Sequence, residues 1–149
     1  LLYFSVLLIR LSLQEIEGVL SVYGLRKGER IIIRSIKQVV SRKRLCARIT
    51  QVHTLYSFFD PLSFETIIFL YAYSRDRRVR RRIDHYLSDL ITVRLHVKGR
   101  DLKRLGITPE TMYSEILQKV FYRKLQKRFD SKAAEEEEAV RIYRQLKKG

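Results

Sequence analysis

Cysteine is almost absent from this chain of 149 residues, which holds only Cys46. A single thiol cannot form an internal disulfide, nor the thiolate cluster of a zinc or iron–sulfur site. We therefore expect a reducing compartment, the cytoplasm. Proline and glycine are also scarce, with two and six residues. Long stretches without turn dipeptides argue against a β-sandwich or barrel, so helices are the expected structure.

The sequence also lacks a long apolar run. Its most apolar segment, residues 1–9, is interrupted by Arg10, well short of the ~20 apolar residues that a membrane span needs. That segment has no initiator Met, no basic leader and no small-residue cleavage site. We interpret it as a buried helix, expect no membrane partner, and take the missing Met as a sign that this chain is a piece of a longer protein.

Residues that carry catalysis do not group in the sequence. The three histidines (His53, His85 and His96) stand apart, without the spacing of metal ligands, and no Asp-x-Asp pair occurs. Residues 24–28 (Gly-Leu-Arg-Lys-Gly) lack the pattern of a phosphate-binding loop. The acidic run 135–138 stands at a helix start, where we attribute it to the helix dipole and to solvation. We expect no catalytic residue, metal or cofactor in this chain.

Apolar residues recur at three- and four-residue spacing through most of the sequence, which predicts amphipathic helices. Ser12 and Glu15 have the spacing of a capping box, and Thr50 and Asp60-Pro61 are typical of further helix starts. We expect an all-α fold, a compact array of about seven to nine helices with no sheet. The expected helices cover residues 1–9, 13–23, 27–48 (one helix, or two joined near Ser41), 51–59, 61–74, 76–97, 100–106, 109–129 and the segment after Asp130 or Ser131.

Positive charge is the strongest signal in the sequence. Lysine and arginine number 31 against 16 acidic residues, a formal net charge of +15. The excess is spread along the chain: ten basic against four acidic residues in 1–60, eight against four in 61–98, and thirteen against eight in 99–149. A folded domain with such a field favours a polyanion as its partner. Nucleic acid fits better than a membrane, because the apolar stripes are needed for packing between helices.

The basic residues cluster in three places: around residues 42–48, between 77 and 82, and on the helix near 119–128. Arginine's planar fork matches phosphate oxygens. The alternative is a solvated face with intrahelical ion pairs such as Arg80 to Asp84, but one aspartate does not offset five arginines. The candidate RNA-binding residues are Arg42, Lys43, Arg44, Arg77, Arg78, Arg81, Arg82, Arg100, Lys103, Lys119, Arg123 and Lys127.

One stretch resembles a known family. The segment from Gly99 to Pro109 reads Gly-Arg-Asp-Leu-Lys-Arg-Leu-Gly-Ile-Thr-Pro, followed by Ile-Leu at 116–117. It resembles the carboxyl-terminal region of bacterial tRNA nucleotidyltransferases, the CCA- or A-adding enzymes, and of the related poly(A) polymerases. There a Gly-x-Asp-Leu-x-x-Leu-Gly-x-x-Pro-Gly motif precedes a long helix, and Glu110 departs from its last glycine. We expect a helix junction, with turns at Gly99 and Gly106 and a cap from Asp101.

The resemblance implies an organisation and a function. Residues 1–98 would be a neck- and body-like helical region, and residues 99–149 a tail-like region packed against it, whereas the catalytic head domain is absent. Mg²⁺ and ATP or CTP are expected only for that head. The resemblance implies a non-catalytic portion that binds the acceptor and elbow of tRNA and supports nucleotide addition to RNA 3′ ends. Its expected partners are RNA, in particular tRNA, and the missing N-terminal catalytic domain.

Two other functions remain open on the sequence. The first is a helical scaffold for protein interaction or dimerisation, which would use its apolar N-terminal helix and bind no RNA. The second, a stand-alone enzyme, has the least support, because no nucleophile, base or metal ligands converge.

Overall fold

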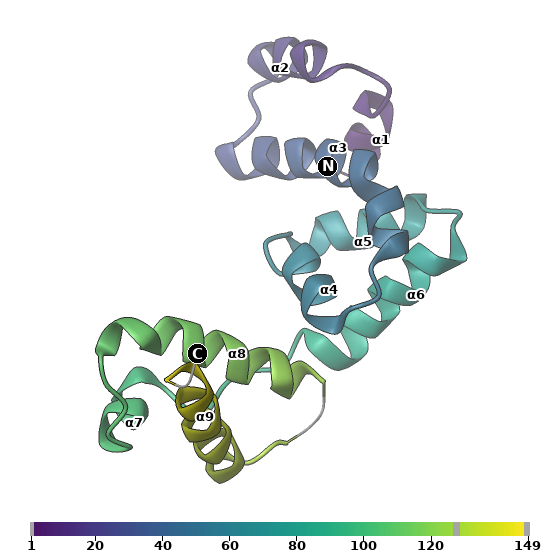
Figure 1. The fold of residues 1–149 in the computed structure, drawn as a ribbon. Coiled ribbons are helices and arrows are strands. Elements are labelled where there is room, and N and C mark those ends of the chain that lie inside the picture. The colour runs from purple at the N-terminus through teal and green to yellow at the C-terminus, as the bar shows by residue number, and fades with distance from the viewer. Residues whose placement is uncertain (1, 127–128, 148–149) are drawn as a thin grey trace. The chain divides into compact units, whose positions relative to one another are not determined.

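A computed structural model gives the structure of residues 2–126 and 129–147, with the side chains of residues 3–43, 46–126 and 129–147 (Figure 1). Over these residues the protein has nine α-helices and no strand, so the predicted all-α class is confirmed. The chain divides into two compact units, Leu1–Ser88 and Asp89–Gly149. This division falls ten residues before the boundary expected near Gly99, and the assignment of neck, body and tail stays a prediction.

Unit 1 is built around one long helix, α3, which packs against two later helices, α5 and α6. A small apolar core of Leu8, Ile16, Leu20 and Ile33 joins its first half to the two helices before it. The helices of unit 1 are α1 (Leu2–Leu8), α2 (Leu13–Val22), α3 (Lys27–Arg48), α4 (Val52–Phe59), α5 (Phe64–Tyr73) and α6 (Arg77–His85), and a π-helical turn (Tyr86–Leu90) follows.

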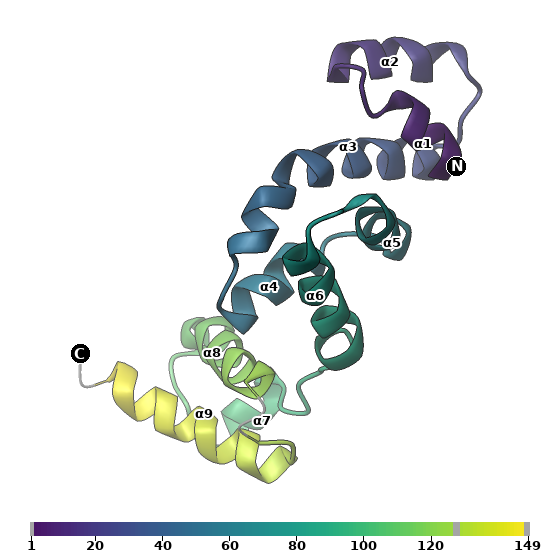
Figure 2. The same ribbon diagram turned by 90° about the vertical axis from the view of Figure 1, so that its right-hand side faces the viewer.

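Helix α3 is a single helix, although the sequence also allowed two helices joined near Ser41. Its apolar positions Ile33, Ile36 and Val39 are buried at the spacing of one helix face. The Ser41 hydroxyl donates to the Lys37 carbonyl oxygen at 3.1 Å, a back-bond that often bends helices. Figure 2 shows α3 continuous but bent.

The start of α2 follows the predicted capping box. The Ser12 hydroxyl accepts from the Glu15 amide at 3.2 Å, and the Glu15 carboxylate accepts from the Ser12 amide at 2.7 Å. Two amides that have no partner inside the helix are thereby satisfied, as the spacing predicted.

Two other predicted helix starts are wrong. Asp60 ends α4, and α5 begins only after Ser63, whose hydroxyl accepts from the Thr66 amide at 3.3 Å. Ser63 supplies the acceptor that Asp60-Pro61 was expected to supply. Thr50 is also not a cap, because Gln51 directly precedes α4 and makes no side-chain cap.

The helix predicted for 76–97 is shorter in the structure. Helix α6 ends at His85, the π-helical turn follows, and residues 91–98 are not helical. The Arg94 guanidinium donates to the carbonyl oxygens of Ile91 at 2.9 Å and Val93 at 2.7 Å. These bonds satisfy carbonyls near the point where the helix stops.

Unit 2 packs three helices and a short 3₁₀ turn around one apolar core. They are α7 (Gly99–Arg104), the turn Glu110–Met112, α8 (Tyr113–Leu125) and α9 (Lys132–Leu146). Helices α8 and α9 lie against each other, and α7 contacts both. The buried core residues are Val97, Leu102, Ile107, Ile116, Val120, Ala139 and Ile142.

The predicted helix junction is present, but only one of its two glycines needs special backbone freedom. Gly106 has φ +73°, the left-handed region that favours glycine. There the Ile107 amide reaches back to the Leu102 carbonyl at 3.1 Å and closes α7. Gly99 begins α7 without a positive φ, so the turn expected at Gly99 is wrong. Asp101 does cap α7, because its carboxylate accepts from the Lys98 amide at 2.8 Å.

Candidate nucleic-acid interface

Helix α6 turns its arginines outward because its apolar residues are fixed in the core. Val79 and Ile83 are fully buried and lie four residues apart on one face. Arg77, Arg78 and Arg81 are exposed and Arg82 is half-buried, as expected for the opposite and flanking faces.

The first turn of α6 is capped by Asp76, whose carboxylate accepts from the Arg78 amide at 2.8 Å. That hydrogen bond, with the nearby Arg78 side chain, holds the pKa of Asp76 below its usual value. The same carboxylate lies 3.5 Å from the Arg78 guanidinium. The Asp76 carboxylate thus already binds an amide at the start of α6. An anion would therefore bind to the arginine side chains of this surface and not to the helix start.

The intrahelical ion pair considered as an alternative for this cluster does not form. Arg80 turns away from Asp84, and its Nε donates to the Ser74 carbonyl oxygen at 2.8 Å. Its guanidinium lies over the ring of Tyr71, 5.6 Å from the ring centroid. Over the described part of the chain, no carboxylate pairs with Arg77, Arg81 or Arg82. The positive charge of α6 therefore remains largely uncompensated.

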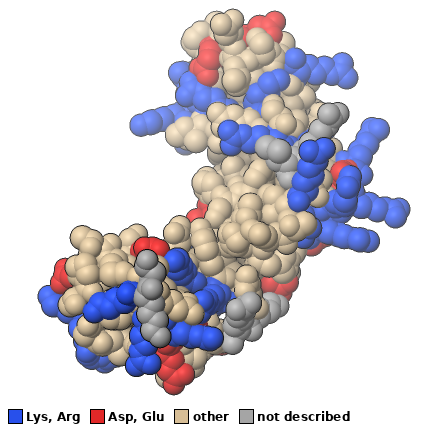
Figure 3. Space-filling view, in the orientation of Figure 1, with Lys and Arg blue, Asp and Glu red and all other residues tan. Residues whose placement is uncertain are grey.

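The end of α3 adds further cations beside α6. Arg42 is exposed, and Lys43 is half-buried with its Nζ 5.1 Å from the centroid of the Tyr73 ring. Below them, burial raises the pKa of the Cys46 thiol to about 11, an effect that the charge of Arg82 partly opposes. The basic clusters that begin at Arg42 and Arg77 lie 35 residues apart in the sequence. They come together because α3 packs against α6. Figure 3 shows Lys and Arg side chains protruding together where α6 begins in Figure 1.

A groove lies between the end of α3 and the start of α6. The sequence predictions missed some of its residues. It is lined by Lys43, Ala72, Tyr73, Ser74, Arg75, Asp76, Val79 and Arg80. Tyr73 and Arg75 of this groove, and the neighbouring Tyr71, were not predicted to belong to the interface. Arg80 lies within the arginine cluster at 77–82 that was favoured for RNA contact, but it was not among the candidate residues. Two tyrosines and an arginine at every second position of residues 71–75 (Tyr-Ala-Tyr-Ser-Arg), just before the arginine cluster, are the signal that could have identified them.

The candidate residues of unit 2 are more strongly compensated. Lys103 pairs with Glu110 at 3.1 Å and Lys119 with Glu115 at 2.9 Å, whereas Arg123 pairs with Glu138. Arg100 is exposed on α7. Lys127 lies outside the described residues, as does the side chain of Arg44. The binding role of every candidate residue, in both units, stays a prediction.

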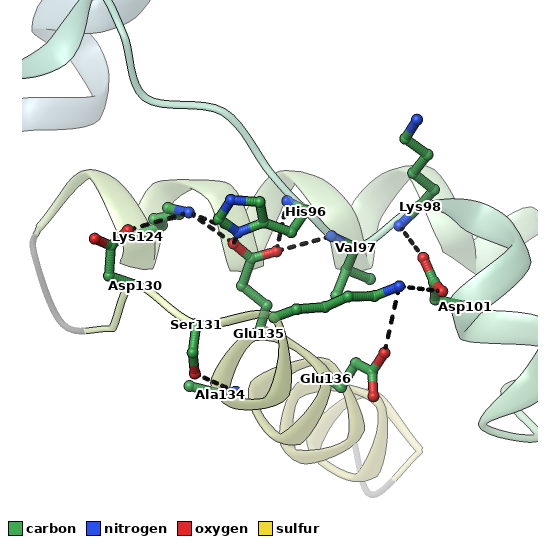
Figure 4. A network of polar contacts seen from close by, with 11 residues as sticks. His96, Val97, Lys98, Asp101, Lys124, Asp130, Ser131, Ala134, Glu135 and Glu136 are labelled. Carbon is green, nitrogen blue, oxygen red and sulfur yellow. Dashed lines mark hydrogen bonds and ion pairs between the residues drawn. The ribbon is translucent and has the colours of Figure 1, made fainter.

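The acidic run at 135–138 has a role that the sequence did not reveal. Glu135 is fully buried, and its carboxylate accepts from the amides of His96 and Val97 and from the Lys124 ammonium, each at 2.8 Å (Figure 4). Burial alone would raise its pKa, but the Lys124 hydrogen bond and the two amides outweigh this and hold the pKa below its usual value. Attributing Glu135 to solvation was therefore wrong: it fixes the non-helical segment before α7 onto α8 and α9.

A second carboxylate ties α7 to α9. Asp101 is nearly buried, accepts from Lys132 at 2.8 Å and lies 3.8 Å from Arg104. The Lys132 bond, followed by the Lys98 amide, lowers the pKa of Asp101. These contacts give the Asp-Leu pair of the motif a structural role, because the aspartate anchors α7 while Leu102 fills the core.

Two other kinds of site find no support in the described residues. Across residues 2–126 and 129–147, no group of three or more His, Cys, Asp or Glu could hold a metal ion. No helix in this part of the chain has the length and apolar character needed to cross a membrane.

These observations define a basic, all-helical region with an arginine-rich surface, and comparison with known proteins gives it a relative. Over 115 residues, 77% of this chain, it is 30% identical to an A-adding tRNA nucleotidyltransferase from Geobacter sulfurreducens. The matched stretch spans 12% of that protein. No family model matches the chain, and no solved structure does. The chain is thus a distant relative of a region of the tRNA nucleotidyltransferases, in agreement with the motif at 99–109.

Proposed function

We propose that this chain is an RNA-binding region that holds tRNA through its basic helix faces, in support of nucleotide addition to RNA 3′ ends. The largely uncompensated arginine face of α6, joined to Arg42 and Lys43 of α3, is the observation that carries the proposal. The relative supports tRNA as the RNA, since its name states that it adds A to tRNA.

The mechanism is recognition of shape and phosphate. A-form RNA hides its base edges in a deep, narrow groove, so a helix face meets phosphates and 2′-hydroxyls. Each phosphate that an arginine neutralises releases counterions, which makes binding depend steeply on salt. Arginines on one helix suit this task, because the helix holds their backbone positions on one face before the RNA binds.

A matched pair of triple variants tests the proposal. R77Q/R78Q/R81Q removes three exposed charges from α6, and R10Q/R26Q/K27Q removes three exposed charges elsewhere in unit 1. In filter-binding titrations with folded tRNA, we expect the α6 variant to lose affinity roughly tenfold or more, with a salt slope smaller by about 2 to 3. The control should change much less.

Two outcomes contradict the proposal. The first is tRNA binding by the unchanged chain that does not vary with salt. The second is an equal loss in both triple variants, which would mean that net charge alone attracts the RNA and that α6 is no specific surface.

One observation favours the alternative of a protein-interaction scaffold. Residues 1–9 were interpreted as a buried helix, but α1 exposes Tyr3 at 91%, Leu7 at 75% and Val6 at 50%, so that interpretation is wrong for this face. Clustered apolar side chains often mark contact surfaces. Sedimentation velocity without RNA tests it. A dimer that is lost in L7E, combined with no tRNA binding, would favour the scaffold over the proposed function.

A further inference from the structure

In the groove between α3 and the turn from α5 to α6, two cations are held over tyrosine rings and not by carboxylates. Elsewhere the described cations are often fixed by carboxylates, as Arg34 is by Glu17 at 2.5 Å. In the groove, Lys43 and Arg80 lie over tyrosine rings, and no ion pair joins either of them, or Arg75, to a carboxylate of the described residues. These cations are positioned while their charge stays available to an anion.

Arg80 has the most contacts of the three. Its Nε donates to the Ser74 carbonyl oxygen and its guanidinium lies over the ring of Tyr71. The two terminal nitrogens are left to a ligand, in the fork geometry that suits a phosphate. Asp76 also lines the groove, but its carboxylate is engaged by Arg78.

Tyr73 adds a surface for a base. One contact of its ring is a parallel stack with Phe69, with centroids 5.7 Å apart and planes 16° apart. Lys43 covers the ring as a cation. A cation on an exposed ring is held weakly, whereas a stacked base is held more firmly. A phosphate that draws Lys43 from the ring would open Tyr73 to the base attached to it.

We propose that this groove, lined by Lys43, Tyr73, Arg75 and Arg80, binds one unpaired nucleotide of the RNA, with its phosphate on the cations and its base on Tyr73. The inference rests on the proposed function, and it adds a preference: RNA with an unpaired nucleotide binds better than a perfect duplex. A face that contacts only phosphates does not make this distinction.

Two RNA probes measure the preference directly. One is a blunt duplex, and the other is the same duplex with a single bulged 2-aminopurine nucleotide. We expect the bulged probe to bind roughly three- to tenfold more tightly, with its fluorescence changed by stacking on Tyr73. Y73L should bind both probes equally and remove the fluorescence change. Y23L, which removes an exposed tyrosine at the end of α2, should keep both signals.

A charge variant keeps the test decisive if Y73L is unstable. Arg75 is exposed and bears no structural contact among those described, so R75Q should fold normally. It should weaken the bulged probe more than the blunt one. The control is R26Q, because Arg26 precedes α3 and lies about five helical turns from Lys43. R26Q should weaken both probes alike.

The outcomes separate the two proposals. Tight, salt-dependent binding of both probes and of tRNA without any preference for the bulge overturns the groove proposal and leaves the proposed function standing. Failure to bind any RNA overturns both. A preference that persists in Y73L or R75Q places the unpaired nucleotide elsewhere and overturns the groove proposal.

Discussion

At the scale of single residues, the buried carboxylate of Glu135 is the clearest departure from what the sequence indicated. Four adjacent glutamates at a helix start are typical of a solvated, dipole-matched turn. Glu136 and Glu138 are half-buried and Glu137 is exposed, whereas Glu135 is enclosed and shares four hydrogen bonds with His96, Val97 and Lys124. The partners come from segments 11 and 38 to 39 residues away, and no local pattern encodes such a distance.

We expect E135Q to destabilise the protein by about 3 kcal/mol at pH 7, because Lys124 would lose the buried charge that compensates its own. The folded-state pKa of Glu135 is lowered from 4.5. Its stabilisation is therefore present above that value and is lost as the pH falls through the folded pKa. Urea unfolding should show the gap between wild type and E135Q shrinking as the pH falls below about 4.5.

The control for this change is E137Q, which removes an exposed carboxylate two residues further along α9. Its stability should match that of the wild type within about 0.5 kcal/mol. Equal stability of E135Q and E137Q at pH 7 would mean that the buried network does not hold unit 2 together.

At the scale of elements, the sequence predicted where most helices lie, but only some of their first and last residues. The capping box at Ser12 and the extent of α3 follow from local chemistry alone. The shortening of the helix predicted for 76–97 does not, because the amides of His96 and Val97 at its predicted end bind Glu135, which a distant helix supplies. The arginine surface could be predicted from the crowding of arginines at 77–82. The groove could not, because it depends on the turn between α5 and α6, which brings Arg80 back over Tyr71.

Two glycines, Gly106 after α7 and Gly18 inside α2, give stability predictions of opposite sign. Gly106 has φ +73°, and the space where an alanine methyl group would lie is open, so G106A should cost about 1 kcal/mol from backbone strain alone. Gly18 lies inside α2, also with open space, so G18A should stabilise by roughly 0.5 to 1 kcal/mol. Chemical denaturation of both variants measures the difference.

G106N provides the control at the junction, since asparagine tolerates the left-handed region better than alanine. It should fall between wild type and G106A. A G106A variant as stable as the wild type would show that the closing turn of α7 does not need this conformation.

At the scale of the whole molecule, the net charge of +15 acts on folding as well as on binding. Like charges crowded on α6 and α3 repel one another, which opposes the compact state. Raising NaCl from about 20 to about 200 mM shortens the Debye length to below ~10 Å. We expect this to raise the melting temperature by roughly 3 °C, while the same salt weakens RNA binding.

Thermal melts of R77Q/R78Q/R81Q are the control for this effect. The variant has lost three of the repelling charges, so its melting temperature should rise less with salt than that of the wild type. A melting temperature that falls with salt would mean that ion pairs such as Lys119 to Glu115 outweigh the repulsion.

Cys46 offers a way to observe unit 1 in motion. Its thiol is fully buried between α3 and α6 and has a pKa of about 11, so at neutral pH it is both unreachable and almost entirely protonated. An alkylating reagent can modify it only in the moments when that packing opens. Because the chain has no second cysteine, the rate of alkylation reports how often α3 and α6 separate. A ligand that binds both helices and holds them together would lower this rate.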